Sequence, residues 1–253
     1  MTRAPWCLLA MACGGGTWEV TVSGAGGVED AIPVSAFADG CSVSFSGVQV
    51  VFTAISLQSA DEAVAEALTG PGVWELTEPG PHRVASMDAP AGHYDRVQVA
   101  IAPAPGATLH GLDSYDEASS LAIAGTLSGP DSTVAFDWHF ALNHTWLCAP
   151  ADLTLPPGGA DGTAVTVWGD HLFYDGLTNA DAVLRGLPVL GADADADGAV
   201  TLDELAAVDV AALGYRVGGR TDVRTLRDQV EALASQIVHL DGATECLVAS
   251  ATP

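Results

Sequence analysis

The chain has 253 residues, of which 32 are acidic, eight are arginine and none is lysine, so its formal net charge is −24. Such a charge repels phosphate backbones and anionic lipid headgroups, which excludes nucleic acid as a partner and favours cations. Hydrophobic residues make up 49% of the chain. That share is enough for one large domain, or for a medium domain with an appendix.

The first sixteen residues predict an exported protein that is held at a membrane by a lipid. A short apolar run from Trp6 to Ala12 is followed by Cys13 and a glycine run. This order resembles a bacterial lipoprotein signal, in which Cys13 carries the lipid and the glycines form a tether. The alternative is an irregular N-terminal segment whose cysteines have no specific role. We expect an outer-membrane, cell-surface or periplasmic protein that touches membrane only through this anchor.

Cysteine usage agrees with export. No two cysteines form a CxxC pair, which excludes a zinc ribbon or a thioredoxin motif. In an exported chain Cys148 and Cys246 are the natural disulfide pair, and this bridge would fasten the C-terminal tail to the middle of the domain. Cys41 stands where a strand begins, and we expect it to remain a buried thiol.

From residue 17 to about residue 168 the pattern is that of β-strands. Trp18, Val20 and Val22 alternate with polar residues, as in a strand with one buried face. Similar segments recur with Gly, Pro, Asp and Ser at their joints: 41–57, 72–84, 93–103, 121–129, 132–142 and 162–173. About seven to nine strands at such spacing favour a sandwich. We predict a mainly β fold, an antiparallel β-sandwich over residues 17–174, after a signal and tether in residues 1–16.

Two segments of this region have distinct patterns. Segment 41–57 begins by alternating and then becomes almost continuously apolar, as expected of a central strand that is buried on both faces. Gly47 in its middle predicts a bulge or bend. Segment 59–68 is predicted to form a short helix, capped by Ser59 with Glu62 three residues later.

Part of the β region is similar to a family of uncharacterised bacterial lipoprotein domains with a transthyretin-like or immunoglobulin-like sandwich. The residues that carry the resemblance are Val48–Leu57, Trp74–Leu76 and "MDAPAGHYDRVQVAIAP", residues 87–103. In that family a Pro-Ala-Gly-x-Tyr turn precedes a long central strand. The resemblance covers roughly residues 43–103. It implies a fold and a secreted habitat, and it implies no activity.

Residues 175–253 predict a helical appendix that packs on the sandwich. Segment 178–187 indicates a short helix, capped by Thr178 or Asn179 and ending at Pro188, and segment 201–208 indicates a second one. In segment 221–242 apolar residues recur at alternating steps of three and four. That spacing predicts one helix with a single buried stripe, made of Val223, Leu226, Val230, Leu233, Ile237 and Leu240.

The segment "DADADGAVTLDE", residues 193–204, has the spacing of an EF-hand calcium loop, D-x-[DN]-x-[DN]-G-x₅-E. Calcium needs six to eight oxygen ligands, and carboxylates on alternate residues wrap one side of the ion. Gly198 permits the sharp reversal, and apolar Val200 can anchor the loop to the core. The expected ligands are Asp193, Asp195, Asp197, the carbonyl of Ala199, Thr201 and Glu204.

An acidic chain can place aspartates together by drift, but drift does not predict Gly, an aliphatic residue and Glu at their required places. Magnesium prefers a tighter octahedron that keeps its waters, and zinc and copper prefer nitrogen or sulfur. We therefore expect Ca²⁺. Because EF-hands usually come in pairs and this loop is single, the ion is expected to be structural rather than to open a groove.

The histidines offer a weaker set of candidates. His139 and His144 lie in "WHFALNHTW", while Asp170 and His171 lie in "WGDHLFYDG" with Asp175 after them. Such a cluster can hold a transition metal or act as an acid–base pair. His139 and His144 differ in strand parity and are expected on opposite faces. We expect His82, His93 and His239 to be solvated, and Trp138, Trp146 and Trp168 to lie in the core.

These observations predict a calcium-binding protein that is secreted or anchored at the surface and acts as a binding or scaffold module. Its ligand would be an unidentified protein or glycan. No nucleophile elbow, Walker loop, dinucleotide fingerprint or HExxH motif is present, so an enzyme is not the expected class. The alternative is a transition-metal-binding protein or a metal-dependent enzyme that uses His171, His139 or His144.

Overall fold

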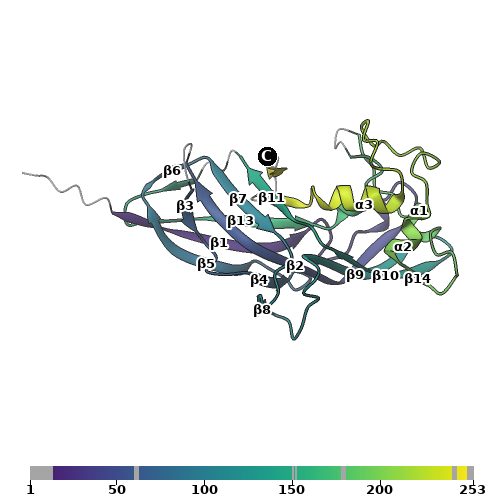
Figure 1. Cartoon of the computed structure of the whole chain (residues 1–253), viewed down its shortest axis with the longest axis horizontal. Helices are drawn as coiled ribbons and strands as arrows, with labels where there is room; N and C mark the ends of the chain where they lie inside the picture. The colour runs from purple at the N-terminus through teal and green to yellow at the C-terminus, as the bar shows by residue number, and fades with distance from the viewer. Residues whose placement is uncertain are drawn as a thin grey trace, which may run out of the picture.

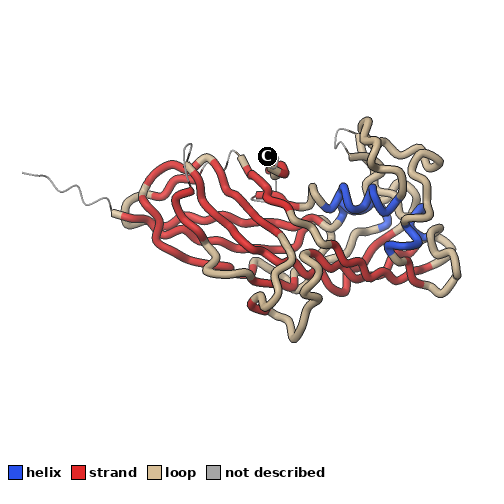
Figure 2. The backbone as a smooth tube through the Cα atoms, in the orientation of Figure 1, coloured by secondary structure: helices blue, strands red, loops and turns tan. Residues whose placement is uncertain are grey.

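The computed structural model describes residues 14–59, 63–149, 151, 153–177, 181–240 and 244–249. Cys13, the predicted site of lipidation, lies outside these residues, as do Glu62, Thr178 and Asn179. Strands are the main regular structure of the described chain, and two curled sheets enclose the main hydrophobic core (Figures 1 and 2). The mainly β, sandwich-like class that the sequence predicts is therefore observed.

The smaller sheet has five strands in the order β16-β15-β13-β1-β5. Their bounds are β1 Gly15–Ala25, β5 His82–Pro90, β13 Ala160–Trp168, β15 Val238–Leu240 and β16 Thr244–Glu245. β1 pairs in parallel with β13, so the prediction of an antiparallel sandwich is wrong at this point. The long chain between these two strands crosses to the other sheet and returns, which lets them run in the same direction.

The larger sheet has ten strands, with β14-β10-β9-β2-β7-β11-β17 as its main order, β3 and β4 paired with β2, and β8 paired with β4. Their bounds are β2 Ser42–Gln58, β3 Ala63–Glu66, β4 Gly72–Glu75, β7 Arg96–Ile101, β8 Thr108–His110, β9 Leu121–Ser128, β10 Thr133–Phe140, β11 His144–Cys148, β14 Ala199–Val200 and β17 Leu247–Val248. β6 Gly92–Tyr94 and β12 Leu153–Leu155 form a separate pair.

The alternation in the sequence explains how these strands face the core. Trp18, Val20 and Val22 are fully buried, and β9 and β10 alternate between buried and more exposed positions along their whole length. β2 is buried on both faces, as predicted, because Val51 packs in a small second core on its outer side. The predicted bulge is present, since the register between β2 and β9 shifts between Phe45 and Gly47.

The predicted helix at 59–68 is wrong where the structure describes that segment. Residues Ala63–Glu66 form β3, which pairs antiparallel with the end of β2. A helix this short is barely stable alone, whereas an extended chain satisfies the open hydrogen-bonding edge of β2.

The helices that precede and follow the acidic loop are shorter than predicted. Residues 181–186 are not helical, and the first helix, α1, spans Leu187–Leu190. Pro188 lies in its first turn instead of ending a helix, as suits a residue without a backbone N–H. The second helix, α2, spans Leu202–Leu205 and is capped by Thr201.

The long predicted helix at 221–242 divides into a helix and a strand. α3 spans Leu226–Ala234, with Thr225 rather than Thr221 as its N-cap. Beyond it, β15 pairs with the edge of β13. Ile237 and Leu240 are buried as the stripe predicts, but in extended chain, because burial alone does not distinguish a helix from a strand.

The predictions for Cys41, Cys148 and Cys246 are confirmed. Cys148 and Cys246 form a disulfide across a sequence separation of 98 residues, and Cys41 is a free, buried cysteine. The bridge joins β11 to the segment between β16 and β17. Among the described residues, no helix is long and apolar enough to cross a bilayer.

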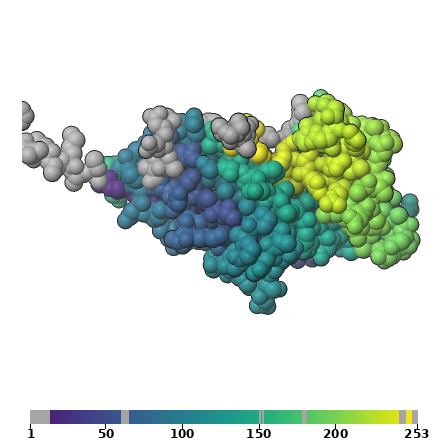
Figure 3. Space-filling model, viewed as in Figure 1, coloured from purple at the N-terminus to yellow at the C-terminus, as the bar shows by residue number. Residues whose placement is uncertain are grey.

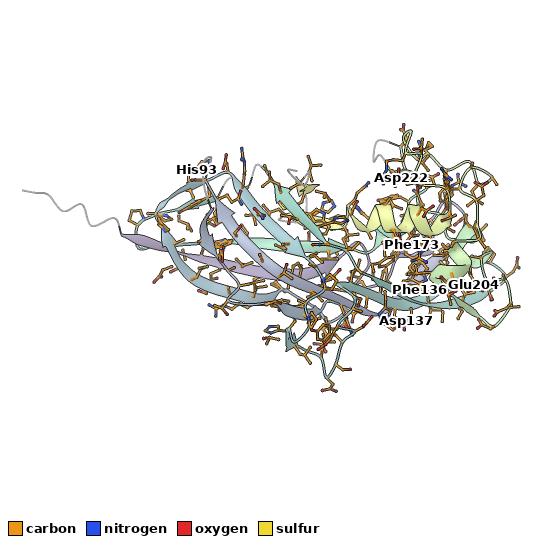
Figure 4. All side chains as sticks on the ribbon, in the orientation of Figure 1. His93, Phe136, Asp137, Phe173, Glu204 and Asp222 are labelled. Atoms are coloured by element: carbon orange, nitrogen blue, oxygen red, sulfur yellow. A yellow bond between two sulfur atoms is a disulfide. The ribbon has the colours of Figure 1, made fainter. Side chains whose placement is uncertain are left out.

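The helices gather at one end of the elongated molecule, beside β9, β10 and β14, while β1 begins at the opposite end (Figure 1). The space-filling view shows this end in the green to yellow colours of the last third of the chain (Figure 3). Glu204 and Asp222 lie there, and His93 lies far from them on the sandwich (Figure 4).

Candidate functional site

The acidic loop brings three carboxylates together. One oxygen from each of Asp193, Asp195 and Asp197 lies within 4.8 Å of the others. Among the described residues no other group of three His, Cys, Asp or Glu side chains converges in this way. Asp195 and Asp197 are exposed, so the cluster opens to solvent at the helical end of the molecule.

The loop backbone is held by its own carboxylates. Asp193 accepts hydrogen bonds from the N–H groups of Asp197 and Gly198, at 3.2 Å each, and Asp197 accepts one from Ala199 at 2.8 Å. Gly198 has a φ of 83°, and nothing within 4 Å would meet a side chain there, so its backbone conformation requires glycine. Ala196 also has a positive φ, of 57°, which alanine adopts only with strain.

The far side of the loop is fixed to the sandwich. β14 pairs in parallel with β10, where Val200 lies opposite Phe136. The indole of Trp138 donates a hydrogen bond of 2.9 Å to the carbonyl of Val200, and both residues are buried. Val200 therefore anchors the loop, as the sequence predicts, and the sheet supplies the anchor.

Glu204 hydrogen-bonds Thr201 and the beginning of the loop, and it is not a member of the group that the three aspartates form. Glu204 accepts hydrogen bonds from the backbone and hydroxyl of Thr201, at 2.8 and 2.9 Å, and from Ala194 N–H at 3.1 Å. The bonds from Thr201, followed by that from Ala194, lower the pKa of Glu204. Glu204 thus completes the capping box of α2 and ties the beginning of the loop to its end. The carbonyl of Ala199 lies in β14, next to the aspartates in sequence.

A second cluster lies inside the protein, around His171. This residue is in the 3-10 helix η2, Asp170–Phe173, and its ring centre is 4.9 Å from that of His239 in β15, with the rings nearly perpendicular at 87°. The ring of Trp168 lies 5.0 Å from His239 and 5.9 Å from His171. His171 and His239 are only 4% and 7% exposed.

Both histidines are neutral near pH 7 and hold free ring nitrogens. Burial, and then the nearby His239, lowers the pKa of His171 to about 4, and burial also lowers the pKa of His239. Nδ1 of His171 and both ring nitrogens of His239 are buried without a hydrogen bond, although the Gln236 carbonyl lies close enough to raise both pKa values slightly. Buried polar atoms without partners are rare and mark strain, catalysis or an absent ion.

The expectation that His239 is solvated at a helix end is therefore wrong. It followed from extending α3 through residue 239, whereas that segment is the buried strand β15. Trp138 and Trp146 are fully buried as predicted, but Trp168 is only partly buried, beside the histidine pair. The two histidines are 68 positions apart, and only the pairing of β15 with β13 brings them together.

Asp170 is next to His171 in sequence but takes part in different contacts. Its Oδ2 accepts a hydrogen bond of 3.4 Å from the Tyr174 hydroxyl, and its buried Oδ1 has no hydrogen-bond partner. Burial raises the pKa of Asp170 to about 6.

The other two candidate histidines stand in separate surroundings. His139 is on the outer face of β10, where its two ring nitrogens face Asp116 and Asp137 at 3.0 and 3.1 Å, in a cleft of about 370 Å³. Because the carboxylates lie on opposite sides of the ring, they do not converge on one ion. His144 packs edge-on against Trp146. Neither residue contacts His171.

Asp175 forms an ion-pair cluster that closes the helical end. It binds Arg185 at 3.0 Å and Arg216 at 3.2 Å, and accepts a hydrogen bond of 3.0 Å from Val183 N–H. Burial acts to raise the pKa of this carboxyl, but these bonds outweigh it and hold the pKa below its usual value. The cluster joins the segment after η2 to the segment before α3.

We expect Asp175→Asn to lower the free energy of unfolding by about 1–3 kcal/mol, since two half-exposed arginines lose their shared carboxylate. The folded-state pKa of Asp175 is depressed, so its stabilisation is complete above the ordinary Asp pKa of about 3.9 and is lost as pH falls through the folded value. Urea titrations at pH 7 and pH 3 measure this. The difference between wild type and variant should shrink at pH 3. Asp222→Asn, which removes an exposed ion pair with Arg220, should leave the free energy of unfolding unchanged.

Comparisons with known proteins add one distant likeness. No protein-family model matches the sequence, and a search of curated proteins gives no match either. The structure is similar to that of MbnP from Methylosinus trichosporium, with a TM-score of 0.41 and 10% identity, over 93% of this chain and 99% of that one. A likeness at this level carries no conclusion about ligand or activity.

Proposed function

We propose that this protein binds Ca²⁺ in the loop 193–204 and that the ion stabilises the junction between the helical end and the sandwich. The convergence of Asp193, Asp195 and Asp197 within 4.8 Å carries the proposal. Three carboxylates so close repel one another unless a cation lies between them. Their oxygens, the carbonyl of Ala199 and the carboxylate of Glu204 are the hard donors that Ca²⁺ prefers.

Strain and anchoring support the same proposal. The positive φ of Ala196 belongs to a conformation that the surroundings must enforce, and such strain gathers at ligand sites. Because Val200 is fixed to β10 and Trp138, an ion on the loop links α2 to the sandwich. The Cys148–Cys246 disulfide supports export, to surroundings where calcium is plentiful. We infer a secreted or surface-anchored module whose protein or glycan ligand is unidentified.

Calcium should raise the melting temperature. At a free Ca²⁺ concentration about one hundred times Kd, binding adds about 2.7 kcal/mol to stability. For a chain of this size that corresponds to about 5–10 °C. Calorimetry of the mature chain, with calcium and with chelator, measures both the binding heat and the shift. Asp195→Asn should abolish most of the shift.

The matched control is Asp203→Asn, which removes one acidic charge beside Glu204 but no expected ligand. Its side chain is 94% exposed and pairs only with Arg227 in the described structure. An equal loss of calcium response in both variants would show that general acidity, and not this loop, binds the ion. An absence of heat and of any melting shift in the wild-type protein contradicts the proposal.

A second candidate function is the binding of a transition-metal ion by His171 and His239. Two imidazoles on one tetrahedral ion, with metal–nitrogen distances of about 2.0–2.1 Å, have ring centres about 5 Å apart. The observed separation is 4.9 Å, and neutral imidazoles are the form that binds metal. Copper or zinc suits this donor type, and the Gln236 carbonyl and water are oxygens that can complete the ion's surroundings.

We expect His171→Leu to abolish stoichiometric Zn²⁺ or Cu²⁺ binding without lowering the melting temperature of the metal-free protein. The reason is that leucine removes a buried nitrogen that has no partner. Elemental analysis of protein purified without chelator, followed by isothermal titration, tests this. His144→Ala, on β11, should leave both results unchanged. A destabilised metal-free His171→Leu protein that still binds the ion would contradict the assignment.

A further inference from the structure

We propose that α3 couples the two metal sites, so that Ca²⁺ in the loop 193–204 tightens the binding of a transition-metal ion by His171 and His239. This inference rests on the proposed function of both sites. It adds that neither site acts independently, because one nine-residue helix is connected at its beginning to the loop and at its end to the histidine pair.

The beginning of α3 is bonded to the chain that leaves the loop. The N–H of Leu226 donates to the carbonyl of Val208 at 2.8 Å, and the N–H of Val210 donates to the carbonyl of Arg224 at 3.1 Å. Arg227 also reaches back to Asp203 in α2, at 3.3 Å. The segment after α2 is therefore joined to the beginning of α3 by backbone hydrogen bonds, and α2 itself by the ion pair, so a displacement of α2 is passed to α3.

The body and end of α3 contact both histidine-bearing segments. Gln229 is fully buried, and its Nε2 donates to the carbonyl of Tyr174, directly after η2. Two residues beyond α3, the carbonyl of Gln236 faces both imidazoles. The carbonyl of Ile237 accepts from Trp168 N–H at 2.9 Å, and the chain then enters β15 with His239.

Glu204 is the proposed calcium ligand that belongs to both the loop and α2. Its carboxylate is now shared between Thr201 and Ala194 and is not grouped with the three aspartates. Turning it toward an ion moves the first turn of α2, whose capping box Glu204 completes. Since metal–nitrogen distances tolerate only a few tenths of an ångström, a small shift of α3 changes how well two imidazoles meet one ion.

The test is isothermal titration of the full mature chain with Zn²⁺, a redox-silent probe, with and without saturating Ca²⁺. We expect Ca²⁺ to lower the Kd for Zn²⁺ by about fivefold or more, within the usual range of coupling between sites. Because coupling is reciprocal, saturating Zn²⁺ must lower the Kd for Ca²⁺ by the same factor. Unequal factors would contradict coupling between two separate sites, because linked binding equilibria are reciprocal whatever the mechanism.

Three variants distinguish a loss of coupling from a loss of ion binding at either site. Glu204→Gln should bind Zn²⁺ with the calcium-free affinity whether or not Ca²⁺ is added, and His171→Leu should bind Ca²⁺ without a response to Zn²⁺. Gln229→Leu should still bind both ions, with the coupling factor reduced toward one. Two bound ions with unchanged Kd values overturn the coupling and leave the proposed function standing. Failure of either ion to bind overturns that site's function and the coupling with it.

Discussion

Replacing Cys148 and Cys246 together by alanine is expected to lower the free energy of unfolding by about 4–5 kcal/mol, with a fall in melting temperature of about 10–20 °C. The bridge closes a loop of 98 residues. Removing a cross-link that closes so long a loop restores much conformational freedom to the unfolded chain. It also releases the segment that holds β16 on β15 and β17 on β11. Thermal and urea unfolding of the oxidised wild type and the double variant measure the loss.

Cys41→Ala is the matched control for this experiment. It also removes a buried cysteine, but one that closes no loop, so the expected loss is about 1 kcal/mol. Equal stability of the oxidised wild type and the double variant would mean that the bridge does not constrain the unfolded state. A loss in Cys41→Ala as large as in the double variant would assign the effect to core packing instead.

Sequence patterns predicted the sandwich well where one face of a strand is buried. The alternation of Trp18, Val20 and Val22 identifies β1, and the continuous apolar run identifies β2 as a strand with two buried faces. The same patterns cannot show strand pairing. The parallel contact of β1 with β13 depends on residues about 145 positions apart, as between Trp18 and Thr163.

Helix length was the weakest sequence prediction, for a physical reason. The stripe from Val223 to Leu240 is buried throughout, but its last part satisfies the free edge of β13 as a strand. That edge exists only in the folded sheet, so local periodicity carries no signal for it. The capping box of Thr225 with Asp228 marks the true beginning of α3 and could have been recognised in the sequence.

The two candidate sites also differ in how far the sequence alone could predict them. The acidic loop is contiguous, so its spacing predicted a cluster that the structure forms from Asp193, Asp195 and Asp197. The histidine pair is assembled from η2 and β15, and the sequence alone predicts a solvated His239. A local motif could be found from sequence, whereas a site between distant segments required the fold.

Phe173→Ala is expected to lower the free energy of unfolding by about 3–5 kcal/mol and the melting temperature by about 6–20 °C. Phe173 is 2% exposed, and its ring packs 5.8 Å from Phe37, 6.2 Å from Phe136 and 6.2 Å from Trp138. Phe136 and Phe173 lie beneath α3 at the helical end (Figure 4). The cavity would therefore loosen the junction itself, including the Trp138 indole that holds Val200 and the acidic loop.

Phe52→Ala separates this local effect from a general loss of core. Phe52 is fully buried against Trp74 in the sandwich, so its removal should reduce stability by a similar amount. Calcium affinity, measured by titration well below both melting temperatures, should fall in Phe173→Ala and remain at the wild-type value in Phe52→Ala. The conservative Phe173→Leu should cost about 1.5 kcal/mol or less and retain calcium binding. Equal calcium affinity in the two alanine variants would show that the aromatic cluster supports the fold without positioning the loop.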